Sequence, residues 1–90
     1  MLRVEAGVAV LDGDLILANA SQWLAEGEAA LTQGVATFDL AGLGQLDSSA
    51  LSLMLSLRRR AEASGSSIEF RNLPDSLISL AKLYGVDDQI

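Results

Sequence analysis

The hydrophobic residues of the chain fall into short runs that are typical of strands and longer stretches with helical spacing. Four runs predict strands, at residues 2–5, 8–11, 35–40 and 67–71. The first two flank an Ala-Gly pair, which is typical of a β-hairpin, and Asp12-Gly13-Asp14 is predicted to be the turn that follows them. The third run is mostly apolar and bounded by glycines, as in a central strand. The fourth alternates polar and apolar residues, as in a half-buried strand.

The first predicted helix follows Asn19 and ends near Leu31. Asn19 can cap this helix, with Gln22 three residues further on as in a capping box. Gly27 lies inside the helix and is expected to weaken it by about 1 kcal/mol relative to alanine. The Thr32-Gln33-Gly34 sequence is predicted to end it.

Two further helices are predicted in the second half of the chain. One starts just after Asp47 and reaches about Ser64; the other has Pro74 in its first turn and Gly85 at its C-terminal cap. Helical spacing predicts the buried residues of the three helices. These are Trp23, Leu24, Ala30 and Leu31 in the first, Ala50, Leu51, Met54, Leu55, Leu57 and Ala61 in the second, and Leu77, Leu80, Ala81 and Tyr84 in the third.

The order of these elements predicts an α/β fold made of a single domain over residues 1–90. Helices between strands act as crossovers, so part of the sheet must be parallel, whereas the N-terminal hairpin is antiparallel. A chain of 90 residues is too short for helices on both faces of a sheet. We therefore expect a mixed sheet of about four strands, covered on one face by helices.

The composition excludes several classes of chemistry. The chain has no cysteine and no histidine, so it lacks a thiol nucleophile, a usual zinc site and the usual general base at neutral pH. The phosphate-loop motif is absent, and Gly42-x-Gly44 lacks the third glycine of a dinucleotide fingerprint. The acidic pairs Asp12/Asp14 and Asp87/Asp88 need no metal to explain them. We therefore expect neither an enzyme nor a bound cofactor.

The net charge of −6 argues against nucleic acid as a partner, because that binding needs a basic face. Arg58-Arg59-Arg60 is predicted to be the solvated C-terminal half of a helix, where the helix dipole favours cations. No apolar stretch approaches the ~20 residues that span a bilayer, and residues 1–5 show no signal-peptide pattern. These features predict a cytoplasmic protein without direct membrane insertion.

The start of the second helix and one of its faces form a candidate docking surface. Asp47, Ser48 and Ser49 can each accept bonds from the free N–H groups of a helix start. Ser49, Ser52 and Ser56 follow at spacings of three and four residues, where a solvated face normally carries better helix formers. Such small side chains let another protein approach closely. A merely tolerated serine face is the alternative interpretation.

Nearly the whole chain resembles a STAS domain. Asp47-Ser48-Ser49-Ala50-Leu51 is similar to the family's Asp-Ser-Ser-Gly-Leu motif, and Leu73-Pro74-Asp75-Ser76 is similar to its entry into the last helix. In anti-sigma-factor antagonists of this family, the second serine of the motif is phosphorylated, which implies Ser49 here. Ala50 departs from the glycine usual in those proteins.

The C-terminal run resembles a particular branch of the family. Ser79-Leu80-Ala81-Lys82-Leu83-Tyr84-Gly85-Val86 is similar to the ending of MlaB-like STAS subunits of the Gram-negative Mla phospholipid-transport complexes. In those proteins the hydroxyl residue directly after the motif aspartate is functionally sensitive, which implies Ser48.

The resemblance implies a non-enzymatic subunit that binds an MlaF-like ABC ATPase and meets the MlaE-like permease only indirectly. We expect Lys82 of the last helix to join the docking surface. The alternative is an anti-sigma-factor antagonist regulated by phosphorylation of Ser48 or Ser49.

Overall fold

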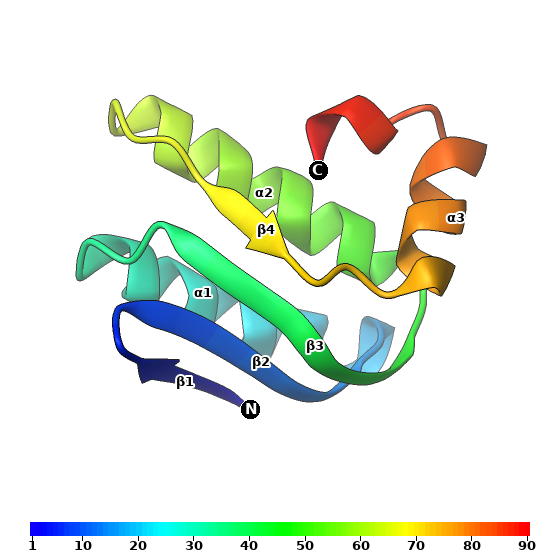
Figure 1. Cartoon of the computed structure of the whole chain (residues 1–90), viewed down its shortest axis with the longest axis horizontal. Helices are drawn as coiled ribbons and strands as arrows, with labels where there is room; N and C mark the ends of the chain where they lie inside the picture. The colour runs from blue at the N-terminus through cyan, green and yellow to red at the C-terminus, as the bar shows by residue number, and fades with distance from the viewer.

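The computed structural model describes residues 1–90 and contains one mixed sheet of four strands in the order β1-β2-β3-β4 (Figure 1). The strands are β1 (Leu2–Glu5), β2 (Val8–Leu15), β3 (Thr37–Leu46) and β4 (Glu69–Arg71). β1 and β2 are antiparallel, whereas β2, β3 and β4 run parallel to one another. The predicted mixed sheet of about four strands is therefore confirmed.

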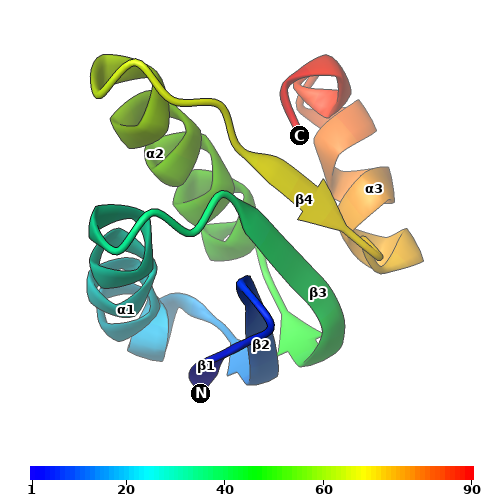
Figure 2. The same ribbon diagram turned by 60° about the vertical axis from the view of Figure 1, so that its left-hand side comes forward.

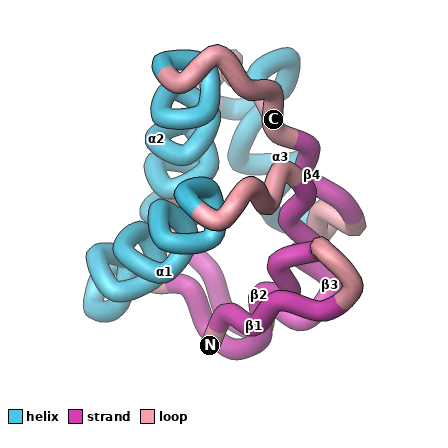
Figure 3. Tube along the Cα trace, turned by 90° about the vertical axis from the view of Figure 1, so that its left-hand side faces the viewer, coloured by secondary structure: helices cyan, strands magenta, loops and turns pink.

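Two helices make the crossovers between the parallel strands and cover the same face of the sheet. They are α1 (Ala20–Thr32), between β2 and β3, and α2 (Ser49–Ala63), between β3 and β4 (Figure 2). The last helix, α3 (Asp75–Leu83), follows β4 and lies beside the first half of α2 (Figure 1). Two short 3-10 turns, η1 (Leu17–Asn19) and η2 (Asp87–Gln89), precede α1 and follow α3. Strands and helices form separate layers (Figure 3).

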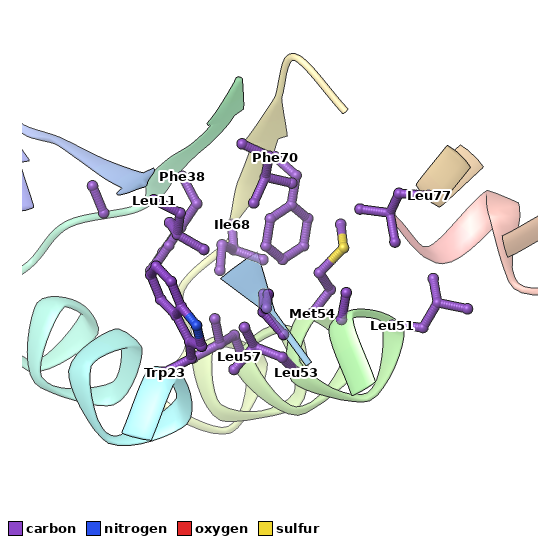
Figure 4. Close-up of a cluster of buried hydrophobic side chains, with 14 of the residues drawn as sticks. Leu11, Trp23, Phe38, Leu51, Leu53, Met54, Leu57, Ile68, Phe70 and Leu77 are labelled. Carbon is purple, nitrogen blue, oxygen red and sulfur yellow. The ribbon is translucent and has the colours of Figure 1, made fainter. Parts of the chain in front are cut away.

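The core lies between the sheet and the three helices, and it is built from 18 buried hydrophobic residues with no buried polar side chain (Figure 4). Phe38 of β3 is completely buried and its ring centroid lies 6.1 Å from that of Phe70 in β4. Gly27 of α1 is also buried, because Leu57 of α2 packs against its backbone. The interior glycine thus marks the crossing of α1 and α2.

The two central strands are longer than the sequence predicts, because they include Gly13, which is predicted to lie in a turn, and Gly42, which is predicted to bound a strand. Asp12-Gly13-Asp14 continues β2, and residues 41–46 continue β3. A Cβ atom at Gly42 would lie 2.8 Å from the Leu11 carbonyl oxygen, and one at Gly44 would collide with the Asp14 carboxylate. These glycines therefore permit close approach of β2 and β3, with two register shifts in the pairing.

The helix predictions are confirmed in position and corrected in detail. Asn19, the predicted N-cap of α1, does not cap this helix with its side chain. Its Oδ1 instead accepts a hydrogen bond from the Ile16 N–H (3.0 Å). Tyr84 was predicted to face inward and is 59% exposed, whereas Leu53, missed by the prediction, is buried. The predicted inward residues that are only half-buried are Leu24, Leu31, Leu55 and Leu80. The fourth strand is also shorter than predicted.

Candidate functional site

The connection from β3 to α2 is anchored by the carboxylate of Asp47. Its Oδ2 accepts the Leu17 N–H (3.0 Å), and its Oδ1 accepts the Ser49 N–H (2.8 Å). The Asp47 N–H donates in turn to the Leu15 carbonyl oxygen (3.3 Å). Asp47 therefore fixes the start of α2 against the end of β2. The hydroxyl of Ser48, at the N-cap position, makes no capping hydrogen bond.

A second set of hydrogen bonds centres on Asp14 and supports the same junction. The Gln45 N–H donates to Asp14 Oδ1 (2.7 Å), which ties the end of β3 to β2. The Asp14 carbonyl oxygen accepts from the side chains of Asn19 and Trp23, both at 2.9 Å. Because these partners come from β2, β3, η1 and α1, the region before α2 is held on several sides.

We predict that Asp47 makes the stability of the domain sensitive to acid. The Leu17 and Ser49 N–H groups hold the pKa of its carboxyl below the ordinary value of 3.8. This stabilisation is complete above the unfolded-state pKa and is lost as the pH falls from 3.8 through the lowered folded-state pKa. Urea unfolding followed across this range should show a shallower loss of stability in Asp47→Asn than in the wild type.

Asp39 adds to the acid-dependent loss in both proteins, because hydrogen bonds from the Ala41 N–H and the Asn72 side chain lower its pKa as well. Only the difference between the wild type and Asp47→Asn therefore reports on Asp47. If the two proteins lose stability in parallel as the pH falls, the proposed anchoring role of Asp47 is wrong.

The predicted docking residues lie along α2 with unequal exposure. Ser48 and Ser52 are exposed, whereas Asp47, Ser49 and Ser56 are half-buried. Lys82 is exposed on α3 and makes no ion pair. Among Ser48, Ser49, Ser52 and Ser56, called the serine strip below, only Ser48 and Ser52 are therefore open to solvent.

A shallow hollow of about 300 Å³ adjoins the strip, between α2 and the residues after α3. Its lining residues are Ser48, Leu51, Ser52, Leu55, Tyr84 and Val86. Gly85, at φ +71°, turns the chain after α3, and the Val86 N–H bonds to the Ala81 carbonyl oxygen (2.8 Å). Helical spacing assigned Tyr84 to the core and made no prediction for Val86, although Gly85 signalled the turn that brings both residues beside α2.

The arginine run matches the predicted solvated face at Arg59 and Arg60, which are exposed, and departs from it at Arg58, which is half-buried. The Arg58 guanidinium lies 5.3 Å from the Phe70 ring centroid and bonds to the Ile68 carbonyl oxygen (3.4 Å). Arg60 pairs with Glu28 of α1 (2.6 Å). Arg58 thus ties α2 to β4, and Arg60 remains exposed although it pairs with α1.

The sheet face opposite the helices carries charges that are paired among themselves. Arg3 forms ion pairs with Glu5 and Asp12, and Arg71 pairs with Glu69 at 3.0 Å. Exposed pairs of this kind add little stability, but they satisfy one another's charge. This face is therefore a weak candidate for an electrostatic partner.

The candidate site contains serine hydroxyls, apolar side chains and the Asp47 carboxylate, whose two oxygens already accept backbone hydrogen bonds. No group of three or more histidine, cysteine, aspartate or glutamate side chains is placed to hold a metal ion. No helix has the length and hydrophobicity needed to cross a bilayer. Small hydroxyls beside an apolar hollow are suited to contact with another protein surface.

A family model described as "Mlab, STAS domain" matches residues 2–90. No curated protein sequence matches the chain. Among solved structures, a putative anti-sigma factor antagonist from Thermotoga maritima aligns with a TM-score of 0.76 at 16% identity, over 100% of this chain and 81% of that one.

The unphosphorylated form of the anti-sigma factor antagonist SpoIIAA aligns with a TM-score of 0.71 at 23% identity, over 98% of this chain and 82% of that one. The crystal structure of Mglu gives a TM-score of 0.62 at 22% identity, over 83% of this chain but only 20% of the Mglu chain. Similarity at these identities establishes the fold alone.

Proposed function

Because the chain belongs to the MlaB-type STAS domain family, we propose that it is a non-enzymatic subunit of an ABC-type phospholipid-transport complex. It binds the ATPase subunit, an MlaF-like protein, and supports its activity. It does not bind the MlaE-like permease directly and is linked to it only through the ATPase subunit. In this role it is cytoplasmic and peripheral to the inner membrane.

The observation that carries the proposal is the exposed start of α2 beside an apolar hollow. Ser48 and Ser52 are both exposed and both line the hollow, so a partner can reach the hydroxyls and the apolar wall together. Asp47 holds this part of α2 in place through two backbone N–H groups. A fixed surface loses little conformational freedom on binding, which favours a lasting complex.

Ser52→Arg tests this surface directly. A long cation at an exposed position that lines the hollow obstructs a close-packed partner, so we expect recovery of the ATPase subunit to fall about tenfold or more. The free energy of unfolding should change by less than about 0.5 kcal/mol, because Ser52 is on the surface. Co-purification from cells expressing both subunits, together with urea unfolding, measures both effects.

Ser66→Arg is the matched control, because Ser66 is also exposed but lies beyond the opposite end of α2. It should recover the ATPase as the wild type does. If Ser52→Arg also does so, the serine strip is only a solvated face and the docking surface lies elsewhere.

The alternative is an anti-sigma-factor antagonist, favoured by the similarity to SpoIIAA and by the exposed Ser48 at the helix start. That function predicts a serine kinase as the co-purifying protein and a phosphate on Ser48 or Ser49. Mass spectrometry of the protein and its partners from native cells distinguishes the two functions.

A further inference from the structure

The hollow between α2 and the residues after α3 combines an apolar lining with an acidic flank. We propose that it receives a basic segment of the ATPase subunit, in which one or two apolar side chains are flanked by lysine or arginine. This inference rests on the proposed function and names the chemistry of the contact.

The lining shows why the occupant needs an apolar side chain. Leu51, Leu55, Tyr84 and Val86 supply the hydrophobic part of the hollow. The neighbouring Leu83 is 76% exposed and Tyr84 is 59% exposed, which leaves two large side chains in water at one place. A volume of about 300 Å³ is at the low end for small-molecule sites, so we assign it to side chains of a partner.

The charges beside the hollow show why the segment is basic. Asp87 and Asp88 directly follow Val86, are exposed and form no ion pair. Lys82 is the only cation among residues 72–90, and Asp75 is a third acidic residue there. Glu5, Asp12, Glu28 and Glu69 form ion pairs with arginines, whereas Asp87 and Asp88 form none.

The N-terminal end of α2 does not reverse this charge. A helix start carries a partial positive charge of roughly half an elementary charge, which by itself favours an anion. Here the Asp47 carboxylate accepts a hydrogen bond from the Ser49 N–H and adds a full negative charge at the helix start. The local balance around Ser48 is therefore negative.

A second copy of this chain fits the hollow less well than a basic partner. Each copy carries a net charge of −6, and docking at this surface would bring two acidic flanks towards each other. Like charges placed together in an interface oppose association. A basic segment instead pairs with Asp87 and Asp88 at the rim while its apolar side chain enters the hollow.

The test is the affinity of the full chain for its co-purified ATPase subunit, measured by calorimetry between about 0.1 and 1 M NaCl. Over this range the Debye length falls from about 10 to 3 Å, so wild-type binding should weaken with salt. The double variant Asp87→Asn/Asp88→Asn should bind about three- to tenfold more weakly at low salt and depend less on salt. Tyr84→Ser should weaken binding at every salt concentration.

Glu62→Gln is the control for net charge, since Glu62 is exposed and unpaired near the C-terminal end of α2. It should change affinity by less than about twofold. A double variant that binds like the wild type, with the same salt dependence, overturns the inference but leaves the proposed function standing. If the wild type does not bind the ATPase at all, both fail. A homodimer of the wild type that buries Tyr84 would assign the hollow to a second copy.

Discussion

Phe38→Ala should remove about 3–5 kcal/mol from the free energy of unfolding, which is a large part of the stability of a domain of this size. Phe38 is completely buried in the central strand β3 and lies beside Phe70, whose ring is tilted by 51° relative to its own. Alanine would lose this contact and leave a cavity between the sheet and α2. Urea unfolding followed by circular dichroism measures the loss.

Val4→Ala on β1 is the control for a smaller side chain in the sheet, because Val4 is 44% exposed. It should cost less than about 1 kcal/mol. A loss of that size in Phe38→Ala would mean that the core collapses to fill the cavity, and that Phe38 does not organise the packing.

Gly27→Val should destabilise the domain by about 2–3 kcal/mol, although valine has a higher helix propensity than glycine. A Cβ atom at Gly27 would lie 2.9 Å from Leu57 Cδ2 and 3.0 Å from Cδ1. Leu57 is itself only 1% exposed and has little room to move away. The two methyl groups of valine would therefore force α1 and α2 apart. Urea unfolding again gives the value.

Ala25→Val places the same residue on the exposed side of α1 and isolates the helix-propensity term. It should cost no more than about 0.5–1 kcal/mol. A Gly27→Val protein as stable as the wild type would show that the contact between α1 and α2 adapts to added volume, contrary to the packing described here.

The fold was predictable because local patterns and chain order agree. The alternation of strand and helix periods along the sequence predicted each crossover. Gly34, Gly65 and Gly85 lie in turns with positive φ, which glycine adopts readily because it has no Cβ atom. The extents of β2 and β3 were not predictable in the same way. A glycine allows both a turn and a close approach of strands, and only the pairing of Gly42 with β2 decides between them.

The candidate site was predictable only in part. The sequence indicated an exposed surface from Ser48 and Ser49 to Ser52 and Ser56, since small polar residues there alternate with a leucine-rich face. Of these four serines, Ser48 and Ser52 are exposed. The hollow depends on residues 84–86 returning beside α2, which helical spacing does not encode. Periodicity assigned Tyr84 to the core because it extends the buried face of α3, whereas the helix ends at Leu83 and the chain turns away.

The edges of the sheet restrict how this domain meets other proteins. β1 and β4 are the edge strands and contain only four and three residues. On β1, the Leu2 N–H donates a hydrogen bond to the Glu26 side chain of α1 (2.9 Å). On β4, charged side chains flank Phe70. Short, charged edges are poor templates for an added strand. An added strand is therefore not the expected mode of contact with a partner, and the isolated domain should resist growth into edge-to-edge β-aggregates.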